Sequence, residues 1–216
     1  MNAVALWNKL DAKQRAVLCG LPFDGAPWTP AMRKLVRLQL VERAPTGWRA
    51  TDLGQHVAKP PLCFLDMDGV VARVIHRPKY AWETEEAWKA RQATAFERID
   101  APSMRRLNAI ADQTGALFVM SSTWRLAENA TPEGYQRVMR ERGFTGKLVG
   151  FTPVVIGPRW MEIERYLRTM ATQPRSFVVL EDFEPMGPLA PRTVVTDEVR
   201  LITDADVEHA VSLLTT

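Results

Sequence analysis

The stretch Pro61-Leu62-Cys63-Phe64-Leu65-Asp66-Met67-Asp68-Gly69-Val70-Val71 decides the fold of the larger part of this chain. A short apolar run ends in two carboxylates one residue apart, and a glycine follows at once. An apolar run of this length, bounded by turn-forming residues, is typical of a strand buried in a parallel sheet. Because side chains alternate along a strand, we expect Asp66 and Asp68 to project together from its carboxyl end, where open α/β sheets bind ligands.

The two carboxylates at this strand end need a partner. They repel each other unless a cation or a proton lies between them. Gly69 lets the chain leave the strand sharply and lets the backbone approach a ligand. The pattern therefore favours a divalent metal beside a carboxylate nucleophile. A simple aspartate–glycine turn after a strand is the alternative that this stretch alone leaves open.

The composition is that of an ordinary soluble globular protein. The chain has 216 residues, of which 46% are apolar and 25% charged. It has no apolar run near the roughly 20 residues that span a bilayer, and its N-terminus lacks the pattern of a signal peptide. Cys19 and Cys63 are far apart without metal-ligand spacing, as expected for buried thiols in a reducing compartment. We expect a cytoplasmic protein with no membrane partner.

The charge is uneven along the chain. Residues 1–60 contain nine Lys/Arg and four Asp/Glu, a net charge of +5, although the whole chain carries only +3. This asymmetry favours an anionic partner for the front of the chain. Lys59-Pro60-Pro61 marks a boundary, because proline lacks an N–H and disfavours helix in the residue before it. We therefore predict two units, 1–59 and 60–216.

The front unit is predicted to contain short helices and a β-hairpin. A helix is expected over 11–20, a second opens at Thr29-Pro30, a hairpin spans 40–50, and another helix starts near Thr51. The pattern resembles a compact winged helix-turn-helix, with 35–54 similar to the wing region of MarR-type regulators. The resemblance implies DNA or RNA binding, for which the outward bases of the second helix are the candidates: Arg33, Lys34 and Arg37. A small accessory domain with solvated charges is the alternative.

After the boundary, strands and helices alternate, which predicts an α/β domain with a parallel sheet. Strands are expected over 62–65, 116–120, 148–150, 176–180 and 193–195. Helices are expected over 101–112, 132–142, 159–170 and 203–214, the last with Asp206 in an acidic capping interaction.

Polar residues follow the strands expected over 116–120 and 176–180. Ser121, Ser122 and Arg125 come after the second strand, where hydroxyls, backbone N–H groups and a guanidinium can hold a phosphate. A serine cluster there can equally serve as a helix cap. Glu181 and Asp182 come after the strand expected over 176–180 and would face the same crevice as Asp66, unless they form only a charged loop.

A cation stands at a helix start between these two strands. Arg159 follows Gly157-Pro158, and a positive charge at this place is unfavourable for the helix dipole. We therefore expect it to serve a neighbouring anion.

The order of these segments resembles the haloacid dehalogenase (HAD) superfamily of phosphotransferases over about residues 62 to 214. Within it, the chain resembles the HAD branch associated with the "Swiss army knife" RNA-repair proteins. The matching runs are Ser121-Ser122-Thr123-Trp124-Arg125, Thr152-Pro153, Arg159-Trp160-Met161-Glu162-Ile163 and Ile202-Thr203-Asp204-Ala205-Asp206. The resemblance implies a HAD-like Rossmannoid sheet with a small cap insertion.

The resemblance also implies catalytic roles. Asp66 would be the nucleophile that forms an aspartyl-phosphate, and Asp68 the general acid and then base. Ser121 and the backbone of Ser122 would hold phosphoryl oxygens. Arg159 would neutralise charge where most HAD enzymes use lysine, which is not a conservative exchange, because a guanidinium binds two oxygens and keeps its proton.

A Mg²⁺ cofactor is implied as well. The Asp66 carboxylate, the Asp68 backbone carbonyl and Asp182 would bind it, with Glu181 in support and Glu184 as a further candidate. Such a cation offsets the repulsion between a carboxylate and a phosphate. Glu181 departs from the family's usual aspartate by one methylene.

The insertion at about 72–100 is expected to form the cap that selects the substrate. Arg77 and Tyr80 are candidate substrate contacts, since bases with aromatics suit a nucleotide, although aromatics there can equally pack the cap onto the core. The insertion is too short for a large cap, so the site should be open. The leading hypothesis is a Mg²⁺-dependent phosphatase acting on a nucleic-acid end or a nucleotide. A small-metabolite phosphatase and a DNA-binding regulator with a ligand-sensing HAD domain are the alternatives.

Overall fold

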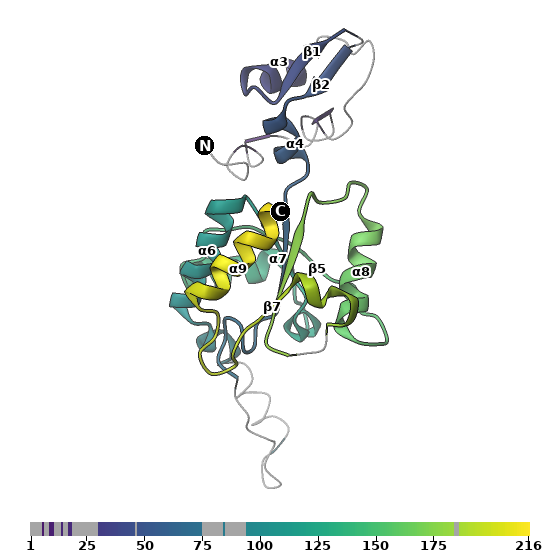
Figure 1. Ribbon diagram of the computed structural model, residues 1–216. Coiled ribbons are helices and arrows are strands. Elements are labelled where there is room, and N and C mark those ends of the chain that lie inside the picture. Colours follow the sequence, from purple (N-terminus) through teal and green to yellow (C-terminus); the bar gives the residue numbers. More distant parts are fainter. Residues whose placement is uncertain are drawn as a thin grey trace.

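The computed structural model describes residues 6, 9–10, 14, 17–18, 30–45, 47–74, 84, 94–183 and 186–216. A small front unit and a larger α/β part follow one another along the chain, joined by the segment around Pro60 (Figure 1). The front unit has its own hydrophobic cluster, built from residues between Leu6 and Ala58. Two further clusters, drawn from residues 62–214, lie on the two faces of the large sheet. Among the described residues, no helix combines the length and apolar character that crossing a bilayer requires.

The α/β part is built on a five-stranded parallel sheet, as predicted. The strands are β3 (Leu62–Leu65), β4 (Leu117–Met120), β5 (Leu148–Phe151), β6 (Phe177–Glu181) and β7 (Thr193–Val195). Their order is β5-β4-β3-β6-β7, so the chain builds outward from β3 in one direction and then resumes on its other side. The order reverses between β3 and β6, and a reversal of this kind opens a ligand crevice at the carboxyl ends.

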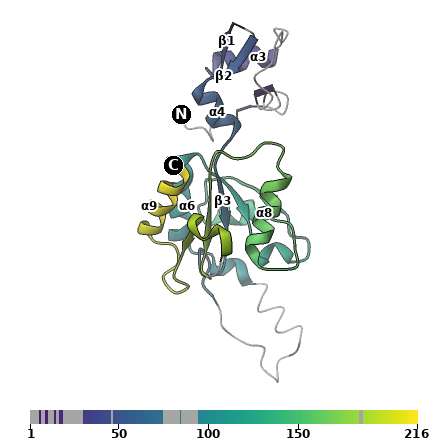
Figure 2. The ribbon, with the colours of Figure 1, turned by 45° about the vertical axis from the view of Figure 1, so that its right-hand side comes forward.

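Helices cover both faces of the sheet, because the side chains of each strand alternate between them. Cys63 and Leu65 pack in the cluster beneath α6 (Ala101–Thr114) and α9 (Asp204–Thr215). Leu62 and Phe64 pack in the opposite cluster beneath α8 (Arg159–Thr169) and the 3-10 helix η3 (Gly187–Arg192). Figure 2 shows α8 on one side of the sheet and α6 with α9 on the other. Helix α7 (Pro132–Glu141) packs beside β5.

The helix starts follow the predicted signals. Asp100 accepts from the Ser103 amide at the start of α6, and Thr131 caps α7. Thr203 and Asp206 form a reciprocal capping box at the start of α9, which confirms the expected acidic cap. These caps fix the ends of the helices from which the site is built.

The front unit contains α3 (Pro30–Arg37), β1 (Val41–Ala44), β2 (Gly47–Ala50) and α4 (Asp52–Ala58). The predicted hairpin is present, with Val41 paired to Ala50. Of the helix expected over 11–20, the described residues Gln14, Val17 and Leu18 are helical, and the Thr29 cap lies outside the described residues. The winged-helix interpretation stays a prediction.

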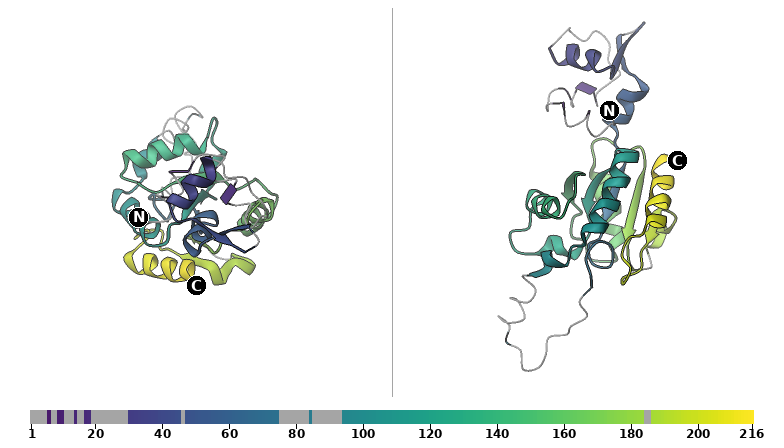
Figure 3. Two further views of the ribbon diagram at one scale, coloured as in Figure 1. Left: turned by 90° about the horizontal axis from the view of Figure 1, so that it is seen from above. Right: turned by 90° about the vertical axis from the view of Figure 1, so that its left-hand side faces the viewer.

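The front unit and the carboxyl ends of the strands lie at opposite ends of the sheet. Helix α4 leads through Lys59-Pro60-Pro61 into the first residue of β3, and the Leu62 amide donates to the Ser176 carbonyl there. The front unit therefore lies beyond the amino ends of the strands, at the top of Figure 1 and of the right-hand view of Figure 3. The strands run away from it.

Candidate active site

A row of polar side chains lines the carboxyl edge of the sheet. Asp66 follows β3, Ser121 follows β4, Thr152 follows β5, and Glu181 ends β6. Phe64, Val119 and Val179 face the α8 cluster, so the residues two positions later face the same side. All four polar residues are buried, with Asp66 and Glu181 each 4% exposed. The alternation that builds the core therefore also assembles the site.

The turn after β3 brings a third carboxylate into the row. Gly69 has φ of +71°, and a Cβ at that position would lie 2.0 Å from the Asp182 Oδ2. Glycine is thus required here for both its backbone conformation and its lack of a side chain. Thr196 Oγ1 donates to the Gly69 carbonyl at 2.9 Å and holds the turn from β7's side.

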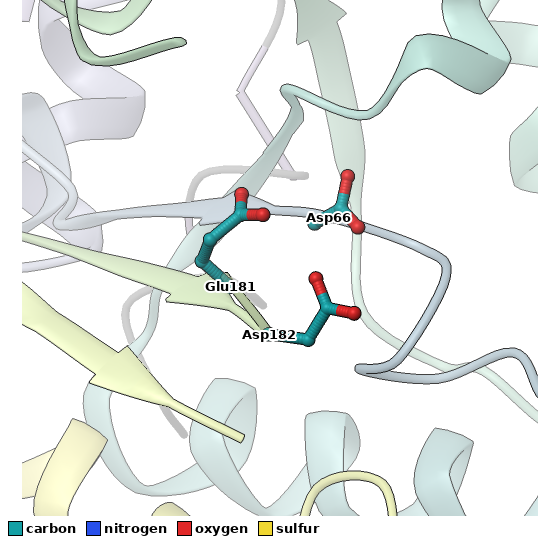
Figure 4. Close-up of side chains that lie close together, drawn as sticks. All are labelled: Asp66, Glu181 and Asp182. Carbon is teal, nitrogen blue, oxygen red and sulfur yellow. The ribbon is translucent and has the colours of Figure 1, made fainter. Parts of the chain in front are cut away.

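Three carboxylates meet at the switch point. One carboxylate oxygen each of Asp66, Glu181 and Asp182 lies within 4.8 Å of the other two. The three side chains lie close together in Figure 4. Burial raises the pKa of Asp66 to about 6, against the opposing charge of Arg159. Burial, together with the charge of Asp66, raises the pKa of Glu181 to about 8. Clustered oxygen donors with poorly solvated negative charge fit a hard divalent cation such as Mg²⁺.

Arg159, the first residue of α8, joins two of these carboxylates. Its Nη1 donates to the Asp66 Oδ1 and, at 2.7 Å, to the Glu181 Oε2. The cation at the helix start thus serves neighbouring anions, as predicted. The two departures from the family pattern, arginine for lysine and glutamate for aspartate, contact each other directly. The Glu181 carboxylate thus meets the Arg159 guanidinium in an ion pair.

Asp68 is held by two donors that the sequence reasoning missed. Arg98 Nη1 donates to the Asp68 Oδ1 at 2.8 Å, and Trp124 Nε1 donates to the Asp68 Oδ2 at 2.7 Å. The Arg98 guanidinium also lies 5.1 Å from the centroid of the Trp124 ring. Arg98 Nη1 bonds the Arg73 carbonyl in addition, so it ties together the two ends of the insertion. Trp124 was visible in the Ser-Ser-x-Trp-Arg run, whereas no sequence signal marked Arg98.

The two serines after β4 lie differently. The Ser121 and Thr152 hydroxyls are buried and have no hydrogen-bond partner among the described residues. An orphaned hydroxyl costs free energy unless a ligand completes it, so Ser121 suits a phosphoryl contact. The Ser122 side chain, in contrast, caps the 3-10 helix η2 (Thr123–Leu126) and bonds the Asp66 carboxyl.

Comparison with known families agrees with this geometry. Residues 62–207 match the model of the HAD domain in Swiss Army Knife RNA repair proteins. The chain belongs to this HAD family. The match covers the sheet, the three clustered carboxylates, Arg159 and α8. It supports a hydrolase of the phosphatase type. No curated protein and no solved structure gave a significant match.

The contacts of Arg125 contradict its predicted role as a phosphate ligand. Its side chain is buried, and its guanidinium donates to the carbonyls of Ser121, Ser122 and Thr152 and, at 2.5 Å, to the Glu162 Oε2. With these bonds made, the group is a brace between β4, β5 and α8 and does not fit the expected role of phosphate ligand. The reasoning missed the partner because Glu162 lies 37 positions away.

Other expected contacts lie elsewhere in the chain. Arg77, Tyr80, Glu184 and most of the insertion at 72–100 fall outside the described residues. In the front unit, Arg33 and Arg37 are exposed, while Lys34 is half-buried and its Nζ donates to the Lys9 carbonyl at 2.5 Å. Arg33 and Arg37 are therefore the more accessible of the three proposed nucleic-acid contacts.

A cleft of about 520 Å³ lies over the carboxylates of Asp66, Glu181 and Asp182 in the HAD domain. Its charged lining residues are Asp66, Asp68, Arg159, Glu181 and Asp182. Thr123 also lines it, and its apolar lining residues are Pro158, Trp160, Phe183, Met186 and Gly187. The volume is within the range of small-ligand pockets.

Proposed function

We propose that this chain is a Mg²⁺-dependent phosphomonoester hydrolase that acts on a nucleic-acid end or a nucleotide. The observation that carries the proposal is the placement of two aspartates at the end of β3. Asp66 is buried in the cleft beside Arg159, and Asp68 is half-buried above it with both oxygens held. A buried nucleophile next to a positioned acid is the arrangement that covalent phosphoryl transfer requires.

The reaction proceeds in two displacements. A carboxylate oxygen of Asp66 attacks phosphorus, the bond to the ester oxygen breaks, and Asp68 gives that oxygen its proton. Asp68 then takes a proton from water, whose oxygen attacks phosphorus and breaks its bond to Asp66. Inorganic phosphate and the free Asp66 carboxylate result. Arg159 offsets negative charge beside the transferring group throughout, while Ser121 offers its unpaired hydroxyl to a phosphoryl oxygen.

The Mg²⁺ site is assigned to the acidic cluster. Asp66 and Asp182 would hold the cation with the Asp68 backbone carbonyl, and Glu181 would support it. Bound there, the cation would lower the repulsion between Asp66 and the substrate phosphate. Burial raises the pKa of Asp66 and Glu181, which supports this site, because a bound cation would offset the cost of ionising the two buried carboxyls.

Two observations support a nucleic-acid end or a nucleotide as the substrate. The family model is that of RNA-repair proteins, and the front of the chain carries a net charge of +5.

The test is a phosphate-release screen with Mg²⁺ and with EDTA. Its substrates are nucleotides, oligonucleotides phosphorylated at the 3′ or 5′ end, and sugar phosphates. We expect release from nucleotides or oligonucleotides with Mg²⁺, and none from Asp66→Asn, whose amide is nearly isosteric but a poor nucleophile. Asp197→Asn, a change at an acid outside the cleft, is the matched control and should keep full activity.

The outcomes separate the candidate functions. Release from sugar phosphates alone would establish a small-metabolite phosphatase. Binding of phosphorylated ligands without any release would establish a ligand-sensing regulator. Retention of more than a few per cent of wild-type release by Asp66→Asn would exclude the covalent mechanism.

A further inference from the structure

The apolar lining residues of the cleft have no part in the chemistry described above. The charged lining residues are Asp66, Asp68, Arg159, Glu181 and Asp182, and all of them belong to the proposed catalytic or metal site. Two aromatic side chains, Trp160 and Phe183, line the same cleft together with Met186. Because the rings and the charged groups line one cleft, a ligand bound to the charged groups can also contact the rings.

Trp160 is fixed in place by the backbone of η3. Gly187 has φ of +50°, and a Cβ there would lie 2.8 Å from the Trp160 Nε1. The indole thus lies directly against this glycine and packs beside Met186 and Leu189. A ring held in advance loses little conformational freedom when a ligand stacks on it.

Phe183 is the exposed member of the pair. Its side chain is 70% exposed although it is large and apolar. An exposed aromatic at the rim of a cleft gains from covering by a flat apolar ligand. Together, the two rings provide one fixed and one accessible stacking surface.

We propose that Trp160 and Phe183 form a stacking subsite for the nucleobase that adjoins the phosphate bound at Asp66. The proposal deepens, and rests on, the proposed phosphatase function. A flat ring suits two aromatic side chains, and the cleft has the size for one nucleotide. Apart from the Trp160 indole N–H, the apolar lining residues Pro158, Trp160, Phe183, Met186 and Gly187 have no side-chain donors or acceptors to distinguish one base from another, so we expect tolerance of all four bases.

The subsite also places base recognition outside the insertion at 72–100. The rings come from the start of α8 and from the loop after β6, which are the same segments that supply Arg159 and Asp182. The same two segments would therefore position both the nucleobase and the phosphate.

The experiment measures the preference for a base directly. Phosphate release is followed on nucleoside 5′-monophosphates against ribose 5-phosphate, and on 3′-phosphorylated dinucleotides against the same molecules with an abasic last residue. Stacking on aromatic side chains predicts a ratio of kcat/KM, base over no base, of at least about 5. The ratio should vary little among the four bases.

Variants of Trp160 and Phe183 test whether their rings cause this preference for substrates with a base. Trp160→Ala and Phe183→Ala should each lower it, and the double variant should bring it close to 1. Ile156→Ala is the matched control, because Ile156 is fully exposed and does not line the cleft. Thermal unfolding checks each fold, and Phe183→Ala keeps the test valid if Trp160→Ala unfolds, since the exposed Phe183 contributes little to packing.

Binding in EDTA separates this inference from the proposed function. Adenosine 5′-monophosphate and ribose 5-phosphate are titrated by calorimetry into the wild type and Phe183→Ala. A phosphatase whose ratio is near 1, or whose ratio persists in the double variant, overturns the subsite but not the function. Tighter binding of the nucleotide that Phe183→Ala weakens, without phosphate release from any substrate, supports the subsite and overturns the function.

Discussion

Trp124 and Asp68, 56 positions apart in the sequence, are joined by a hydrogen bond of 2.7 Å from the indole Nε1 to the carboxylate Oδ2. Arg98 holds the other oxygen of the same carboxylate and stacks on the indole. The proposed general acid is thus oriented by two side chains that support each other. Neither of them lies in the segment directly after β3 that contains Asp68.

Trp124→Phe removes this donor and keeps an aromatic ring. Because a hydrogen bond to a charged group contributes about 1.5–3 kcal/mol, we expect kcat to fall by roughly tenfold or more. The loss should be larger with alkyl phosphates than with p-nitrophenyl phosphate, whose leaving group needs little protonation. Steady-state kinetics on both substrates measure it. Tyr135→Phe is the control, since it removes a hydroxyl that bonds the Trp124 carbonyl and leaves Asp68 untouched. Equal losses on both substrates would contradict a role in orienting the acid.

Arg125→Ala should destabilise the fold. The variant leaves Glu162 buried without its cation and removes donors from three carbonyls. Breaking a buried pair typically costs about 3–5 kcal/mol, whereas an exposed pair contributes less than about 1 kcal/mol. Arg168→Ala, which breaks the exposed pair with Glu164, is the matched control. Urea unfolding of both variants decides the matter, and equal midpoints would show that the buried pair does not brace the site.

The free energy of unfolding should depend on pH because of Asp66 and Glu181. Both Asp66 and Glu181 have a raised pKa in the folded chain, about 6 and about 8. A raised acid contributes stability that is present at low pH and is lost as the pH rises through the folded pKa, because ionisation in the buried site is costly. The metal-free protein should therefore lose stability between about pH 4 and pH 8.

The same acids predict how Mg²⁺ acts on stability. Mg²⁺ binds the ionised carboxylates, and Asp66 and Glu181 are more fully ionised at pH 8 than at pH 5. The cation should therefore raise the melting temperature more at pH 8. Calorimetry with Mg²⁺ and with EDTA at each pH measures the difference, and Asp182→Ala should reduce it. An equal rise at both pH values would place the cation elsewhere.

Arg33 and Arg37 allow a test of the front unit. If these exposed bases contact nucleic acid, changing both to alanine should weaken oligonucleotide binding and reduce the salt dependence. Each lost duplex phosphate contact lowers the slope of log affinity against log salt by about 0.9. Fluorescence anisotropy at several salt concentrations measures it, with Arg168→Ala, which removes one exposed positive charge from the other part of the chain, as a control. An unchanged slope would leave the front unit as a structural or protein-docking module.

Local patterns were sufficient to predict most of the fold. The run from Leu62 to Leu65 and the three-residue strand Thr193–Val195 form as expected, because short apolar segments between breakers have few alternatives. The helix that starts at Pro132 ends one residue earlier than predicted, and β6 begins one residue later and extends to Glu181. Ends vary because terminal residues make few hydrogen bonds within their element.

The site was predictable where register determines it and unpredictable where long-range pairing does. Asp66 and Glu181 converge because parallel strands in register place their last residues side by side. Arg125, by contrast, was assigned to phosphate from its neighbours in sequence, although its true partner is Glu162 on α8. Arg98 contacts Asp68 because the two described ends of the insertion lie together, with Arg98 bonded to the Arg73 carbonyl, and no local sequence pattern indicates that contact.

Because the front unit lies beyond the amino ends of the strands, the length of the sheet separates it from the catalytic cleft. From Pro61 to Asp66 the chain runs five residues along β3, roughly 16 Å at about 3.3 Å per residue. At about 3.4 Å per nucleotide step, that span corresponds to roughly five steps of a duplex. A mononucleotide in the cleft is then too small to touch Arg33 or Arg37, whereas a longer ligand would reach both ends. Removing the basic side chains should matter only above a threshold of substrate length.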